Sequence, residues 1–193
     1  VTIIDGRNGK RQEVVIPGTA RDAAAPAGKE AGIDEHLLEG TRHGRIPKVA
    51  SNGVRPVDAY AHPGAPAPAN STSPRVAIVI GGLGISASGT ADALSRLPAA
   101  ITLAFAPYGP SVAGLAAQAR ARGHEVVLQA PMEPFDYPDN DPGPQTLLTT
   151  LAPEQNLDRL HWLMSRLQGY VGLTNYMGAR FTASEKALAP VLD

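Results

Sequence analysis

Polar side chains that could do chemistry follow the apolar runs in the second half of the chain. Glu133 stands between Pro131 and Pro134, shortly after the apolar run 125–129. A carboxylate at the end of a strand can act as a general base or bind sugar hydroxyls. It can equally accept backbone N–H bonds in a turn braced by proline. Glu133 is therefore the candidate catalytic residue, with a structural role as the alternative.

Asn175, Tyr176 and Arg180 form a second polar group, at the end of a later apolar run. An amide, a phenol ring and a guanidinium can together contact a carbohydrate or an anion, the phenol by stacking on a sugar face. Gln129 ends an earlier run and joins them as a candidate substrate-binding residue. An ion pair of Arg180 with Glu133 or Glu185 is the alternative.

Glycines follow the first strong apolar run, 76–80, in the order Gly81-Gly82-Leu83-Gly84. Glycine lets the backbone come close to a ligand, and it also suits a strand-to-helix turn that needs positive φ. The spacing of Gly82, Gly84 and Ala87 matches a dinucleotide fingerprint. The end of the next predicted strand is Ala106-Pro107-Tyr108, where that fingerprint needs an acidic residue. A dinucleotide-binding oxidoreductase is therefore the less favoured reading.

The elements that must position these residues are short apolar runs alternating with amphipathic segments, from residue 75 onward. This alternation is typical of βα repeats around a parallel sheet. The predicted strands are 76–80, 101–105, 125–129 and 171–175. The predicted helices are one capped by Ser88, one capped by Ser111, one over 153–167, and one opened by a capping box of Thr182 and Glu185. We expect the long connection 130–146 to line the binding face.

The first 74 residues differ in composition from the rest. β-Branched runs flank the glycine-bearing segment 5–10 and predict a hairpin over 1–16. Residues 17–74 are rich in alanine, glycine and proline, which predicts a linker that is mostly irregular or disordered. A domain over 75–193 follows. Because the chain begins with Val1 and shows no signal pattern, we expect it to be cut from a longer protein.

Composition argues against several classes of function. A net charge of −1 and the lack of a dense Lys/Arg run argue against nucleic-acid binding. The chain has no cysteine, which excludes disulfides, cysteine-bound zinc and thiol catalysis. No run of about 20 apolar residues occurs unbroken by glycine, proline or polar residues. Membrane attachment would therefore need an anchor outside this chain.

Several segments of the second half resemble the divergent polysaccharide deacetylase family, a bacterial envelope group related to the carbohydrate deacetylases. They include Pro-Met-Glu-Pro at 131–134 and Asn-Tyr-Met-Gly at 175–178, and the full set is 76–84, 102–108, 123–128, 131–134, 140–144 and 175–182. The resemblance implies the N-terminal half of a (β/α)7-type deacetylase barrel, truncated at its C-terminus. It also implies a hydrolase-like protein in the periplasm, or anchored to the inner membrane and facing the periplasm.

The resemblance further implies a metal site whose positions are changed in this chain. Active relatives carry two aspartates where Gly81 and Gly82 stand, and histidines at or next to Gln129 and at Tyr176. One aspartate and two histidines can hold a divalent cation and leave a position for water. Glycine, glutamine and tyrosine do not reproduce that donor set. We therefore expect no cofactor, assign no metal ligand, and leave open whether residues beyond 193 complete a site.

Together these observations predict a deacetylase-like protein of carbohydrate metabolism at the cell envelope, with its catalysis absent or altered. The expected partner is a glycan, contacted by Gln129, Asn175, Tyr176 and Arg180 beside the backbone of Gly81, Gly82 and Gly84. The alternative is a non-catalytic glycan-binding or scaffold protein of the periplasm.

Overall fold

The computed structural model describes residues 2–4, 11–13, 32–62, 76–109 and 111–192. They belong to two units, 1–31 and 32–193. In the first unit, β1 (Thr2–Ile4) pairs antiparallel with β2 (Arg11–Glu13), as the predicted hairpin requires. The rest of that hairpin and the predicted linker over 17–31 and 63–74 lie outside the described residues. Within the described residues, no helix is long and apolar enough to span a bilayer.

Four described strands of the second unit form a parallel sheet in chain order: β5 (Val79–Leu83), β6 (Thr102–Phe105), β7 (Val126–Met132) and β8 (Leu173–Met177). They are joined by α2 (Ala87–Arg96), α3 (Val112–Ala121) and α4 (Pro153–Met164). Two helices follow β8, namely α5 (Ala179–Thr182) and α6 (Glu185–Leu192). The predicted α/β class with parallel βα repeats is confirmed, and the arrangement is consistent with part of a deacetylase-type barrel.

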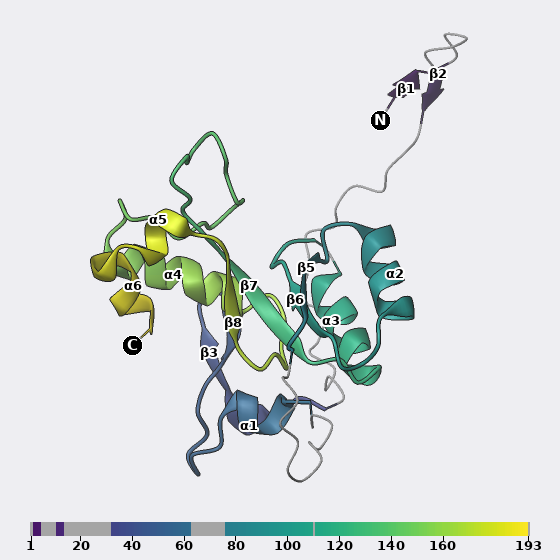
Figure 1. The fold of residues 1–193 in the computed structure, drawn as a ribbon, viewed down its shortest axis with the longest axis horizontal. Helices are drawn as coiled ribbons and strands as arrows, with labels where there is room; N and C mark the ends of the chain where they lie inside the picture. Colours follow the sequence, from purple (N-terminus) through teal and green to yellow (C-terminus); the bar gives the residue numbers. More distant parts are fainter. Residues whose placement is uncertain (1, 5–10, 14–31, 63–75, 110, 193) are drawn as a thin grey trace. The chain divides into compact units, whose positions relative to one another are not determined.

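Two apolar clusters cover the sheet, and β7 contributes to both. Val126 and Leu128, at the start of β7, pack with the residues under α2 and α3. Ala130, near its end, packs with Leu163 of α4 and Phe181 of α5. In Figure 1, α2 and α3 accordingly lie beside β5 and β6, while α4, α5 and α6 lie beside β7 and β8. The longest strand of the sheet thus joins the two parts of the core.

Most of the strands lie further along the chain than the apolar runs indicate. β5 covers 79–83 instead of 76–80, so Gly81 and Gly82 lie inside a strand and not in a turn after it. Val76 is 83% exposed, and the ladder with β6 starts only at Val79, opposite Thr102. β5 is an edge of the described sheet and has one neighbour, so hydrophobicity alone does not fix where its pairing begins. β7 likewise runs three residues past the predicted end, to Met132, and β8 is shifted to 173–177.

Helix boundaries differ from the predictions at three places. Ser86, not Ser88, caps α2, since its extended backbone lets its hydroxyl accept from Gly89 N at 3.2 Å. α4 ends at Met164, before the predicted end. The predicted capping box is wrong because Thr182 belongs to α5, where its hydroxyl donates to Gly178 O.

Residues 32–62 are folded, although the sequence predicts an irregular linker there. The 3-10 helix η1 (Glu35–Leu37) leads into the antiparallel pair β3 (Leu38–Thr41) and β4 (Gly44–Pro47), and α1 (Pro56–Tyr60) follows. Leu37 and Ile46 are buried at 0% and 3% exposure. The prediction failed because these isolated apolar residues are buried by tertiary contacts rather than by a local periodic pattern.

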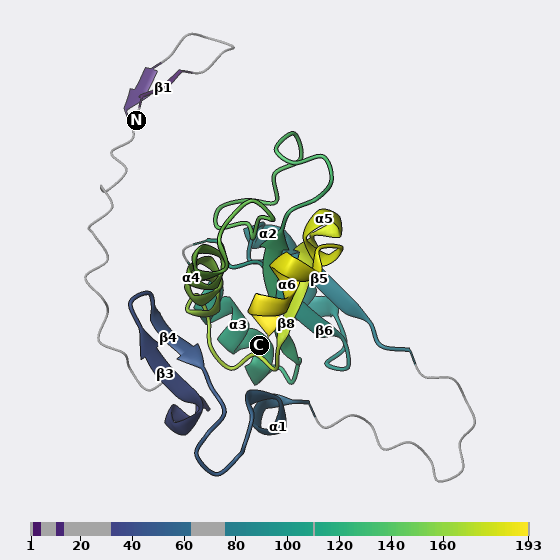
Figure 2. The same cartoon turned by 90° about the vertical axis from the view of Figure 1, so that its left-hand side faces the viewer.

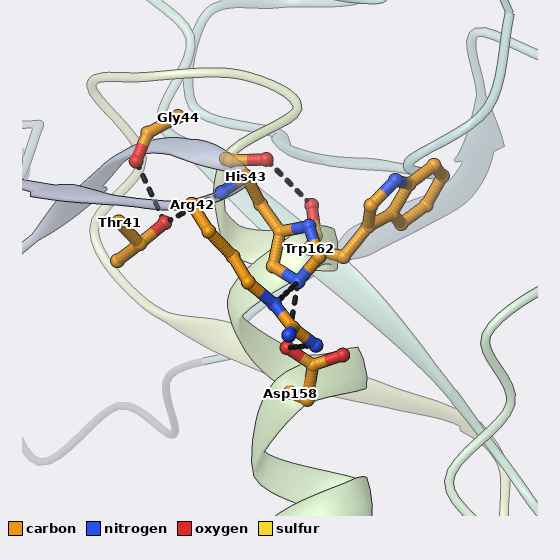
Figure 3. A network of polar contacts seen from close by, with 7 residues as sticks. Thr41, Arg42, His43, Gly44, Asp158 and Trp162 are labelled. Atoms are coloured by element: carbon orange, nitrogen blue, oxygen red, sulfur yellow. Dashed lines mark hydrogen bonds and ion pairs between the residues drawn. The ribbon is translucent and has the colours of Figure 1, made fainter.

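Polar contacts fasten the β3–β4 hairpin to α4 (Figure 3). Asp158 Oδ1 accepts from Arg42 and lies 2.7 Å from His43 Nε2. The hydrogen bond from Arg42 is the main reason that the pKa of Asp158 is lowered. After α4, Gln168 Nε2 donates to the backbone oxygen of Arg45 in β4 at 2.5 Å. The hairpin is therefore part of the second unit rather than an appendage to it.

The same segment also reaches the start of β7. His62 N donates to Glu125 Oε2 at 3.3 Å, and Arg120 stacks over the ring of Tyr60 at 4.4 Å. Figure 2 shows β3, β4 and α1 at the end of the sheet opposite the long β7–α4 connection. Residues 32–62 thus cover the amino ends of the strands and leave the carboxyl ends clear.

If residues 32–62 belong to the folded unit, Leu37→Ala should lower the free energy of unfolding by about 2–5 kcal/mol, since it removes a buried side chain. Leu192→Ala is the matched control, because Leu192 is 74% exposed. Urea unfolding followed by circular dichroism measures both. Equal midpoints for the two variants would show that this segment does not contribute to the core.

Candidate functional site

A pocket of about 140 Å³ lies at the carboxyl ends of the strands. Parallel α/β sheets generally bind ligands at this edge. Each strand of the sheet, or the connection that follows it, contributes to its wall, which consists of Gly82, Ile85, Ala106, Pro107, Tyr108, Gln129, Pro131, Pro142 and Tyr176. Its side chains are mostly apolar or aromatic, and Gln129 supplies the amide.

The Gln129 side chain lies directly against the two glycines of β5. Its Oε1 accepts from Gly82 N at 2.7 Å. Its Nε2 lies 2.9 Å from where a Cβ on residue 81 would stand, which is closer than real Cβ contacts come. Gly82 itself has φ +77°, which favours glycine. The group that lies close to the backbone at Gly81 is thus the Gln129 side chain, and the approach of a ligand there stays a prediction.

Gly84 has a packing role. Its φ is +89°, and its N–H donates to Thr90 Oγ1 at 2.9 Å. A Cβ on Gly109, in the next connection, would lie 2.9 Å from Gly84 O. The β5–α2 and β6–α3 connections therefore pack backbone against backbone, and Gly84 is absent from the pocket wall.

Glu133 is buried just beyond β7, and both of its carboxylate oxygens have protein partners. Oε2 accepts from Thr149 N at 2.5 Å and from Thr149 Oγ1 at 2.7 Å. Oε1 accepts from Arg180 Nη1 at 3.1 Å, so the ion pair expected as the alternative for Arg180 is present. Glu133 does not line the pocket. These contacts match the structural alternative for this residue.

The protonation of Glu133 reflects two opposing effects. Burial raises the pKa of its carboxyl, but the hydrogen bonds from Thr149 and the charge of Arg180 outweigh burial, so the pKa is lowered overall. Glu133 is thus an anion at neutral pH. To act as a general base, the Glu133 carboxylate would have to accept a proton from a substrate or a water. Its hydrogen bonds from Thr149 and Arg180 stabilise the anion and therefore oppose that protonation.

The two remaining predicted residues of β8 have different surroundings. Tyr176 lines the pocket and is 39% exposed. Asn175 is exposed, and its Nδ2 donates to the backbone oxygen of Met177 at 2.7 Å. That bond accompanies an unusual backbone, since Met177 has φ +56°. The structure therefore brings Gly82, Gln129 and Tyr176 together, and it leaves Asn175 out of the pocket wall.

Tyr108 is a pocket residue that sequence reasoning did not select. Its hydroxyl donates to Pro144 O at 2.6 Å, and a Cβ on Gly143 would lie 2.9 Å from the same hydroxyl. Burial, followed by the charge of Asp141, raises the pKa of Tyr108 to about 12, which keeps the phenol protonated. Its place directly after a predicted strand, in the stretch Ala106-Pro107-Tyr108, was the signal that could have found it.

The positions that the family resemblance relates to metal ligands do converge in space, because Gly82, Gln129 and Tyr176 share one pocket. Zinc sites in proteins are built from imidazole, thiolate or carboxylate groups. An amide, a phenol and two glycines do not fit a zinc ion. Within the described residues, no three His, Cys, Asp or Glu side chains are grouped so that they could hold a metal.

Comparison with known proteins identifies the family of the chain. The family model of the divergent polysaccharide deacetylases matches residues 78–193. The chain belongs to this family. The uncharacterized protein YibQ of Escherichia coli K12 is 28% identical over 123 residues, which is 62% of this chain and 36% of YibQ.

A solved structure of an uncharacterized protein from Agrobacterium tumefaciens C58 is also similar. It is 44% identical, with a TM-score of 0.70, over 76% of this chain and 58% of that protein. The chain thus spans less than two thirds of the length of both relatives. The shared fold supports the α/β class of this chain.

Replacing Glu133 by glutamine should lower the free energy of unfolding at pH 7 by about 1–3 kcal/mol, because an amide cannot accept from both Thr149 and Arg180. Since the folded pKa of Glu133 is lowered, its contribution is complete above the unfolded pKa, about 4.3. It is lost as the pH falls through the folded value. The measurement is the urea midpoint from pH 7 to pH 3 for both proteins.

The difference between wild type and Glu133→Gln should therefore shrink as the solution is acidified. Glu39→Gln is the control, because Glu39 is an exposed carboxylate on β3. A gap between wild type and Glu133→Gln that stays constant down to pH 3 would show that the ionised carboxylate is not what stabilises this region.

Proposed function

We propose that the pocket binds a neutral glycan and that metal-dependent deacetylation is absent or altered in this protein. Tyr108 and Tyr176 supply aromatic surface, and sugars present apolar C–H faces that stack on such rings. Gln129 supplies a hydrogen-bonding group among them. Membership of a carbohydrate-active family supports a glycan as the ligand class.

One observation carries the proposal about the chemistry. Gly82, Gln129 and Tyr176, which the family resemblance relates to metal ligands, meet in one pocket whose side chains are uncharged. A bound water needs a strong Lewis acid or a general base to become a nucleophile. The nearest buried carboxylate, that of Glu133, is held by Thr149 and Arg180. Binding without hydrolysis is therefore the function that these residues support best.

The proposal extends to the location of the protein. Family resemblance favours the periplasm, or anchorage to the inner membrane facing the periplasm. Fractionation of cells that produce the full-length protein tests this, and recovery with the cytosol would contradict it.

Isothermal titration with cellotetraose and chitotetraose tests glycan binding. Wild type should bind at least one of the two, and Tyr176→Ala should weaken that binding about fivefold or more through loss of ring stacking. Phe135→Ala is the control, because Phe135 is a 65% exposed aromatic residue of the β7–α4 connection that does not line the pocket. Equal losses in both variants would point to non-specific contact with aromatic rings.

The full-length protein should release no acetate from chitotetraose and should carry zinc well below one ion per chain. Acetate is measured enzymatically, and zinc by plasma mass spectrometry. Stoichiometric zinc together with turnover would overturn the proposed loss of metal-dependent chemistry, because it would mean that residues outside this chain complete a site.

A further inference from the structure

The Gln129 amide is oriented by the protein and keeps an unused donor. Because Oε1 accepts from Gly82 N at 2.7 Å, the oxygen and the nitrogen of the amide are distinguished. The residue is 8% exposed. Among the described residues, no group accepts a hydrogen bond from Nε2. Nε2 is not one of the described buried side-chain atoms that lack a partner, so it remains accessible from the pocket, where a ligand acceptor can replace water.

The other polar groups of the pocket wall differ in availability. The Tyr108 hydroxyl already donates to Pro144 O at 2.6 Å. The Tyr176 hydroxyl has no hydrogen bond to another described residue, and Tyr176 is 39% exposed. Gln129 Nε2 is therefore a donor that is accessible from the pocket, and the hydrogen bond from Gly82 N to Oε1 fixes its position.

We infer that Gln129 Nε2 selects ligands by donating to an uncharged acceptor oxygen, a hydroxyl or a carbonyl of a sugar unit. This inference rests on the proposed glycan function. The N–H groups of an amide carry partial positive charge, so an ammonium group at the same place is disfavoured. The pocket should thus discriminate between neutral sugars and cationic amino sugars.

Gly81 is needed for this position of the Gln129 amide. Gln129 Nε2 lies 2.9 Å from where a Cβ on residue 81 would stand, so a side chain at 81 and this amide orientation exclude each other. Gly81 keeps the space in which the amide lies.

Gln129→Glu tests the role of the Nε2 donor directly, because the substitution replaces that nitrogen by an oxygen and keeps the other heavy atoms of the side chain. The carboxylate can still accept from Gly82 N, while an acceptor replaces the Nε2 donor. Gln155→Glu is the matched control, since Gln155 Oε1 also accepts from a backbone N–H, that of Ala152 at 3.0 Å, away from the pocket wall. Titrations use cellotetraose, chitotetraose and the tetramer of glucosamine, which separate hydroxyl, carbonyl and ammonium groups.

Gln129→Glu should weaken binding of the better neutral tetramer roughly tenfold or more and should strengthen binding of the glucosamine tetramer, while Gln155→Glu matches wild type. Unchanged binding of the neutral tetramer by Gln129→Glu would overturn the inference and leave the proposed function intact. Failure of wild type to bind any tetramer would instead overturn the proposed function.

A second measurement does not depend on the folding of a variant. In wild type, the assigned side-chain ¹⁵N–¹H₂ resonances of Gln129 should shift on addition of the neutral tetramer that binds. Shifts confined to other residues, with Gln129 unmoved at saturation, would overturn the role of its amide.

Discussion

The hydrogen bonds and the ion pair of the buried Glu133 side chain are the interactions on which the edge of the sheet at the strands' C-terminal ends depends. The side chain of Glu133 binds Thr149, at the far end of the β7–α4 connection, and Arg180 of α5. Its backbone oxygen accepts from the N–H groups of Arg180 and Phe181 at 3.1 Å each, and its N–H donates to Leu147 O at 2.9 Å. A charge buried without these partners would be strongly unfavourable. Because they are present, one residue holds both ends of the long connection against the start of α5.

The pocket wall follows from that arrangement. With its ends fixed near Glu133, the long connection places Pro142 at the pocket and Pro144 within reach of Tyr108. The phenol lies so close to Gly143, which has φ +126°, that a side chain there would collide with it. On the other side, Gly84 and Gly109 let the two preceding connections touch through their backbones. Close backbone contacts at Gly84, Gly109 and Gly143 therefore help to set the shape of the site.

Features that local sequence patterns determine, such as the order of strands and helices, could be predicted from the sequence. Features that depend on contacts between distant residues could not. Alternating strand and helix signals were enough for the parallel sheet, and several matching segments taken together were enough for the family. The first residue of β5 could not be predicted from hydrophobicity, because Val76 is as apolar as Val79, where pairing with β6 begins, and yet is 83% exposed. The folding of 32–62 depends on long-range contacts such as Asp158 with His43, which leave no periodic signal. Tyr108 was missed for a related reason, since its importance lies in a partner 36 residues away.

Gly81 and Gln129 link the chemistry of the site to its packing. A side chain at 81 would need the space that the end of the Gln129 side chain now takes, so the amide would have to shift to admit it. The amide oxygen also binds Gly82 N, so moving Gln129 would leave that N–H without its present partner. The position of the Gln129 amide therefore depends on the glycine at 81 and on the N–H of Gly82, so contacts between β5 and β7 shape this part of the pocket wall.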